Sequence, residues 1–104
     1  MKAARKRRLA AAGWRVGSAS QFLGLTEPEA ALVELKLVLA DALRRSRAAR
    51  GLSQTELAER MRSSQSRVAK IEAGDPCVSL DLIIRALIAA GVTTRDIGRE
   101  LAGN

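Results

Sequence analysis

Residues 52–74 read LSQTELAERMRSSQSRVAKIEAG, and this stretch predicts two short helices joined by a tight turn. Ser53 and Glu56 have the spacing of a capping box, which starts the first helix, Gln54–Met61. Ser64 is placed to cap the second helix. The pattern therefore sets both helix starts within one continuous segment.

The apolar residues of these two helices form narrow stripes that can close on each other. The stripes contain Leu57, Met61, Val68 and Ile71. Ala58 falls where the helices would cross, and a larger side chain there would push them apart. The segment is thus predicted to pack as one unit, with its polar side chains outward.

At these residues the chain resembles the helix-turn-helix of the XRE family, the phage repressor and Cro type. The resemblance rests on the pattern L-S-Q-x-E-L-A, on S-x-S-x-V at the second helix, and on the exit I-E-x-G. It implies an all-α, five-helix lambda-repressor-like DNA-binding domain. Two residues depart from the family: Arg62 stands where Gly is frequent, and Ser63 where a buried Val or Ile is usual. A left-handed Arg62 would cost ~1–2 kcal/mol.

The chain divides into a basic N-terminal arm with a short helical turn, residues 1–25, and an XRE-type domain, residues 26–104, with the motif at 53–74. Thr26 and Glu29 form a second capping box, which starts a helix running from Glu27 to about Arg50. Its first half is apolar nearly all round, which implies that it is covered either by the N-terminal segment or by a subunit interface. Ser79 and Thr94 are the expected caps of two further helices, and no segment alternates as a strand would.

Composition excludes several classes of function. The 104 residues include no His and one Cys, so a metal centre, a cofactor-dependent site and a Ser-His or Cys-His nucleophile are not expected. No apolar run suits a signal peptide or a membrane span, which predicts a cytoplasmic protein that is not an enzyme. Cys77 reads as a small loop residue in a reducing compartment.

The net charge of +7 is concentrated in two blocks. Residues 1–26 carry six basic side chains and no acid, and residues 44–70 carry eight basic side chains against two acids. The segments 27–43 and 71–104 are mildly acidic. This distribution is typical of a face that binds a polyanion.

The second helix of the motif carries the side chains expected to read DNA bases in a major groove. These are Gln65, Ser66, Arg67 and Lys70. Arg67 can donate two hydrogen bonds to guanine, and Gln65 can pair with adenine. The residues expected to contact phosphates are Gln54, Ser64, Arg44 and Arg45. A single polar residue on the second helix would be interpreted as solvated surface. The four base-reading candidates on one face instead favour recognition of DNA.

One recognition helix contacts too few bases to select a genomic site, so a homodimer on a palindromic operator is predicted. The interface is expected on the last two helices, with the front of the long helix as the alternative. The candidate residues are Ile84, Leu87, Ile88, Val92, Ile97 and Leu101.

The string Q-S-R-V-A-K-I-E-A-G-D, together with the N-terminal extension, also resembles the HigA-type antitoxins, which repress their own operon and neutralise a RelE-like toxin. The predicted function is therefore a repressor that serves as the antitoxin of a type II toxin–antitoxin pair. The alternative is a stand-alone XRE regulator. Partner binding is assigned to Trp14, Phe22, Leu32 and Val33. The positive charge of residues 1–25 leaves DNA phosphates as an alternative ligand of the arm.

Overall fold

The computed structural model describes residues 26–103, which fold into five α-helices without a strand. The helices are α3 (Glu27–Ala49), α4 (Gln54–Met61), α5 (Gln65–Glu72), α6 (Leu80–Ala89) and α7 (Thr94–Ala102). The predicted all-α class with five helices is confirmed. The predicted helical turn before Thr26 lies outside the described residues.

Hydroxyl caps start every one of these helices. Thr26 and Ser53 form complete capping boxes with the third helical residue, as the spacing predicted. Ser64 and Ser79 accept a backbone N–H bond at the starts of α5 and α6. The last cap is one residue earlier than predicted: Thr93, not Thr94, accepts the Asp96 amide, because Thr94 already belongs to the helix. Sequence spacing therefore located four caps correctly and the fifth to within one residue.

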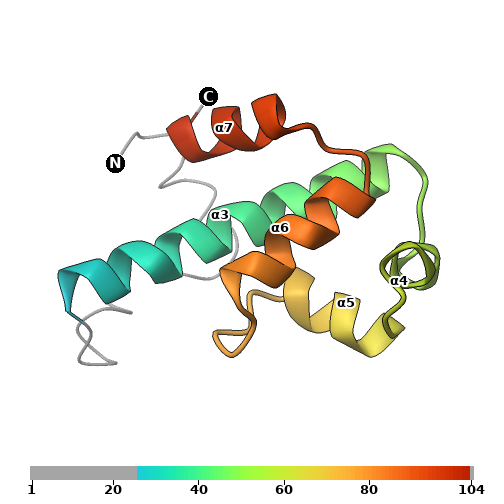
Figure 1. Ribbon diagram of the computed structural model, residues 1–104, viewed down its shortest axis with the longest axis horizontal. Helices are drawn as coiled ribbons and strands as arrows, with labels where there is room; N and C mark the ends of the chain where they lie inside the picture. Colours follow the sequence, from blue (N-terminus) through green and yellow to red (C-terminus); the bar gives the residue numbers. More distant parts are fainter. Residues whose placement is uncertain (1–25, 104) are drawn as a thin grey trace.

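Three helices, α5, α6 and α7, pack against α3, whereas α4 packs against α5 and α6 (Figure 1). α6 runs alongside α3, while α7 lies on one side of α3 and α5 on the other. The largest fully buried side chains are Leu39, Leu43, Leu57, Val68, Ile71, Ile83 and Leu87. The core is thus aliphatic, and among the described residues no polar or charged residue is fully buried. None of the described helices combines the length and apolar character needed to cross a membrane.

The first half of α3 is packed differently from the second. Leu37 and Val38 are buried in a small cluster of their own with Val33 against it. Leu32, one turn earlier, is 41% exposed. The apolar surplus predicted for this half is therefore only partly covered within the described residues.

Candidate nucleic-acid interface

The turn between α4 and α5 is left-handed at Arg62, where φ is 54° and ψ is 47°. The Arg62 amide donates to the Glu59 carbonyl at 3.1 Å, and the Ser63 amide donates to the Ala58 carbonyl at 2.8 Å. These two bonds form a Schellman motif, which normally places Gly at the left-handed residue. Arg62 is the one non-Gly residue with positive φ in the described part of the chain. The Schellman motif is therefore formed with Arg62 in the position that Gly usually takes.

The packing of α5 decides which side chains face outward. Val68 and Ile71 are fully buried, so the opposite side of the helix faces solvent. Since a helix turns by about 100° per residue, Ser66 and Lys70 lie at the centre of that outer face. Gln65 and Arg67 flank them on either side. All four predicted base-reading residues are exposed: Gln65, Ser66, Arg67 and Lys70.

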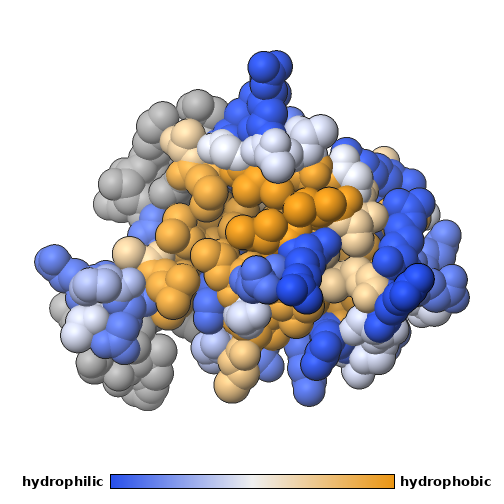
Figure 2. All heavy atoms as spheres, viewed as in Figure 1, coloured by the Kyte–Doolittle hydropathy of each residue, from blue (hydrophilic) through white to orange (hydrophobic). Residues whose placement is uncertain are grey.

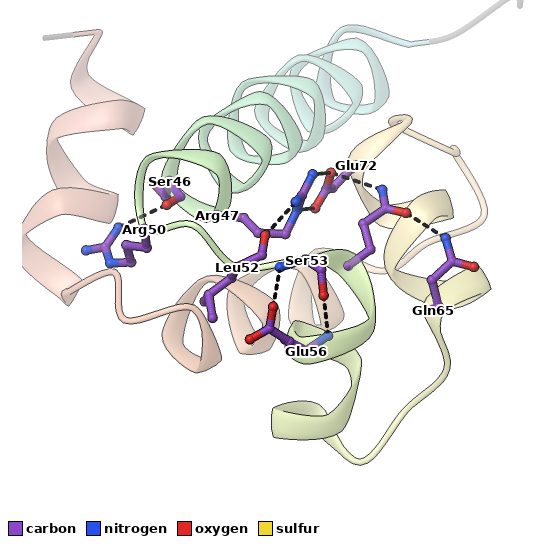
Figure 3. A network of polar contacts seen from close by, with 9 residues as sticks. Ser46, Arg47, Arg50, Leu52, Ser53, Glu56, Gln65 and Glu72 are labelled. Atoms are coloured by element: carbon purple, nitrogen blue, oxygen red, sulfur yellow. Dashed lines mark hydrogen bonds and ion pairs between the residues drawn. The ribbon is translucent and has the colours of Figure 1, made fainter.

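Gln65 and Gln54 are hydrogen-bonded to each other (Figure 3). Gln65 Nε2 donates to Gln54 Oε1 at 2.6 Å, and Gln54 Nε2 donates to Glu72 Oε1 at 3.3 Å. Gln54, predicted as a phosphate contact, therefore also holds the side chain at the start of α5. This connection between the two helices was not predicted.

The far end of α5 is clamped to α3 by an ion pair with two hydrogen bonds (Figure 3). Arg47 Nε donates to Glu72 Oε2 at 2.5 Å, and Nη2 donates to Oε1 at 2.9 Å. Arg47 Nη1 also donates to the Leu52 carbonyl at 2.7 Å. Only 17% of the Arg47 side chain and 5% of the Glu72 side chain are exposed. The bond to Glu72 raises the pKa of Arg47 above its ordinary value, so the guanidinium stays charged.

The position of Glu72 in the sequence indicates that it needs such a clamp. Glu72 follows Ile71 on the inner side of α5, where a carboxylate requires a cationic partner. A cation was therefore to be expected on a neighbouring helix, although the sequence does not say which one.

The remaining predicted phosphate contacts lie in different places. Arg44 donates to Asp41 at 2.6 Å and is 55% exposed beside the end of α5. Arg45 donates to Asp41 at 2.9 Å and to Glu100 of α7 at 3.0 Å. Because α7 lies across α3 from α5 (Figure 1), Arg45 points away from the exposed outer face of α5. Ser64 uses its hydroxyl oxygen to cap α5 through the Arg67 amide.

A shallow groove of about 390 Å³ runs between α5 and the loop before α6. Ser66, Arg67 and Lys70 line one side of it, and Cys77 and Ser79 the other. No acid in the described part of the chain forms an ion pair with Arg67 or Lys70. These two cations are therefore available to an anionic ligand lying along α5.

Burial separates the predicted dimer residues into two sets. Leu87, Val92 and Ile97 are at most 8% exposed and belong to the core, so they offer little surface to a second copy. Their apolar character serves internal packing. Ile84 and Leu101 are half-buried, while Ile88 is 54% exposed. Of the predicted partner-binding residues, Leu32 is exposed and Val33 half-buried, and Trp14 and Phe22 lie outside the described residues.

A family model described as Helix-turn-helix (HTH_3) matches residues 43–97, more than half of the chain. The chain belongs to this XRE-type helix-turn-helix family. The predicted resemblance to the XRE family is thereby confirmed. Members of this family are DNA-binding regulators of transcription, and this general function applies to the chain. Neither curated proteins nor solved structures gave a match to this chain.

Proposed function

We propose that this protein is a sequence-specific repressor that lays the outer face of α5 in the major groove of a palindromic DNA operator. The observation that carries the proposal is the contrast within α5. Val68 and Ile71 are fully buried, whereas Ser66 and Lys70 are exposed opposite them and Gln65 and Arg67 are exposed on either flank. Lys70 and Arg67, without an ion-pair partner in the described residues, suit guanine and phosphate oxygens. The ion pair between Arg47 and Glu72 fastens the end of this helix to α3.

The bond between Gln65 and Gln54 restricts what Gln65 can read. With one of its two Nε2 N–H groups donating to Gln54, Gln65 keeps its Oε1 to accept a hydrogen bond and its second N–H to donate one. Amino groups that donate in the major groove belong to adenine and cytosine. The Oε1 of Gln65 therefore suits an adenine or a cytosine at its position in the half-site, and the remaining N–H can also donate to adenine N7.

Two copies are needed to read a palindrome, and the apolar surface of the chain offers a place for them to meet. Figure 2 shows an apolar area that extends over α6 and adjoining parts of α3 and α7. Ile84 on α6 and Leu101 on α7 are only half-buried by their own chain. We place the two-fold interface at these two side chains, with half-sites about 34–36 Å apart.

The test begins with selection of a binding sequence from random duplexes, followed by titration of that duplex and a scrambled one. Arg67→Ala and Lys70→Ala should each weaken the selected duplex by about 1–3 kcal/mol and relax the preference at one base position. Arg95→Ala on α7 is the matched control and should leave affinity unchanged. Equal losses on both duplexes would assign the two residues to phosphates and contradict base reading.

An antitoxin function is the second candidate, favoured by the exposure of Leu32 in the first half of α3. Exposed apolar side chains beside acids suit a basic protein partner such as a RelE-like toxin. Co-expression with the adjacent reading frame tests this candidate: Leu32→Asp should abolish co-purification, while Ile84→Asp should not. A stand-alone regulator would give no co-purified partner with either variant.

A further inference from the structure

We infer that copies of this chain also associate head to tail, with the start of α3 in one copy docking into an arginine-rimmed pocket of the next. The pocket, about 360 Å³, lies between the end of α4, the following turn and α6. Its rim carries four guanidinium groups and its floor is apolar. The residues that define this arginine pocket are Arg60, Arg62, Arg67, Arg85, Leu82 and Ile88.

The charges of the arginine pocket are only weakly satisfied within the chain. No carboxylate of the described residues lines it. Arg85 pairs with Asp81 at 3.3 Å, but both side chains are about three-quarters exposed, so water screens the pair. Arg60 donates a long bond of 3.4 Å to the Ala89 carbonyl. The pocket therefore favours an anionic ligand.

The apolar side chains that line the pocket restrict which anionic ligands fit it. Ile88 is 54% exposed, which leaves an aliphatic surface among the guanidinium groups. A phosphodiester backbone carries no aliphatic side chain that could cover it. A protein segment with both carboxylates and an aliphatic side chain matches the two properties together.

The start of α3 has this chemistry. Glu27 and Glu29 lie in its first turn, and Leu32 is 41% exposed. Glu29 and Leu32 are three residues apart and share one side of the helix. Leu32 and Ile88 are the two exposed large hydrophobic residues of residues 26–103. Acidic side chains accompany Leu32, and basic side chains accompany Ile88. We call Glu27, Glu29 and Leu32 the acidic end.

The acidic end and the arginine pocket cannot meet within one copy. α3 begins at one end of the long axis of the molecule, whereas α4 and its turn into α5 lie toward the other (Figure 1). A contact between them is heterologous and leaves an unused surface at each end of the pair, so it can repeat. It differs in this respect from the two-fold contact at Ile84 and Leu101, and the two together would join neighbouring dimers.

Two full-length variants, each with one surface disabled, test the proposal in the absence of DNA. The first carries Glu27→Lys and Glu29→Gln, because Gln keeps the capping geometry of Glu29 while losing its charge. The second carries Arg62→Glu and Arg85→Glu, since neither arginine belongs to the proposed base-reading set. Sedimentation measures association beyond the dimer as a function of protein concentration. Circular dichroism verifies that each variant remains helical.

The wild-type chain should form assemblies larger than the dimer. For each variant alone, this association should be weaker by at least about tenfold. The mixture of the two should recover one contact, because the first variant retains the pocket and the second retains the acidic end. Arg95→Glu, which changes charge on α7 outside both surfaces, should behave as wild type. A wild-type chain that stops at the dimer, or a mixture no stronger than its components, overturns the proposal.

Discussion

The two ends of α5 are built in opposite ways. At the end nearest Glu72, a carboxylate 5% exposed is held by two bonds from Arg47 and one from Gln54. At the end nearest Gln65, exposed side chains project outward, and only Gln65 bonds to the neighbouring helix. The chain thus fixes the position of this helix at one end and leaves the other end free for a ligand. Substitutions at the two ends should therefore separate stability from recognition.

The largest expected effect is at the clamped end. Glu72→Ala removes the partner of Arg47 and of Gln54, and it should lower the free energy of unfolding by about 2–4 kcal/mol. The value is below that of a completely buried pair because 17% of the Arg47 side chain remains in contact with water. Urea denaturation measures the change.

Asp81→Ala is the matched control for this substitution, because it breaks the exposed pair with Arg85. Its cost should stay below about 1 kcal/mol. Equal losses for Glu72→Ala and Asp81→Ala would show that the clamp does not stabilise the domain.

The exit of α5 should give the next largest effect. Gly74 has φ of 75°, and an added Cβ would lie 2.8 Å from Leu37 Cδ2. Turning the Leu37 side chain relieves part of this overlap, so Gly74→Ala should cost about 2–3 kcal/mol. Gly51 also has positive φ, at 67°, but an added Cβ meets no atom within 4 Å.

Gly51→Ala therefore isolates the cost of the backbone conformation, about 1–2 kcal/mol. Comparing thermal unfolding of the two variants gives the contribution of the Leu37 contact. A larger loss at Gly51 than at Gly74 would contradict the proposed packing between α3 and the exit of α5.

These features differ in how far the sequence could predict them. Caps are local, so the spacing of Ser53 and Glu56 was enough to predict the start of α4. The left-handed position of Arg62 was expected only from the resemblance to the XRE family, in which Gly is frequent there. The clamp joins Arg47 to a residue 25 positions away, and no local pattern selects that partner. Hydrophobic periodicity also cannot distinguish burial by the same chain from burial by a second copy. For that reason Leu87, Val92 and Ile97 were assigned to a dimer interface although they lie in the core.

The entrance to α5 should respond in the stabilising direction. Arg62→Gly removes the strain of a left-handed non-Gly residue, about 1–2 kcal/mol, but it also increases the conformational freedom of the unfolded chain. The net gain in the free energy of unfolding should be about 0.5–1 kcal/mol. Arg60→Gly, in the helical part of α4, should instead destabilise the domain by about 1 kcal/mol. Losses of similar size for both variants would mean that the turn is not strained at Arg62.

The smallest expected change in the free energy of unfolding comes from the cap of α4, the helix that begins with Gln54. This change depends on pH. The Glu56 carboxylate accepts the Ser53 amide at 3.1 Å, and this bond lowers the pKa of Glu56 from its ordinary value. Because the folded pKa is below the unfolded one, the stabilisation is complete above the unfolded pKa and is lost as pH falls through the folded pKa. Glu56→Gln keeps a hydrogen-bond acceptor but cannot titrate. The wild-type chain should therefore be slightly more stable than this variant at neutral pH, and urea denaturation at acidic pH should show the difference disappearing. A difference that stays constant across this range would mean that the charge on Glu56 does not contribute to the cap.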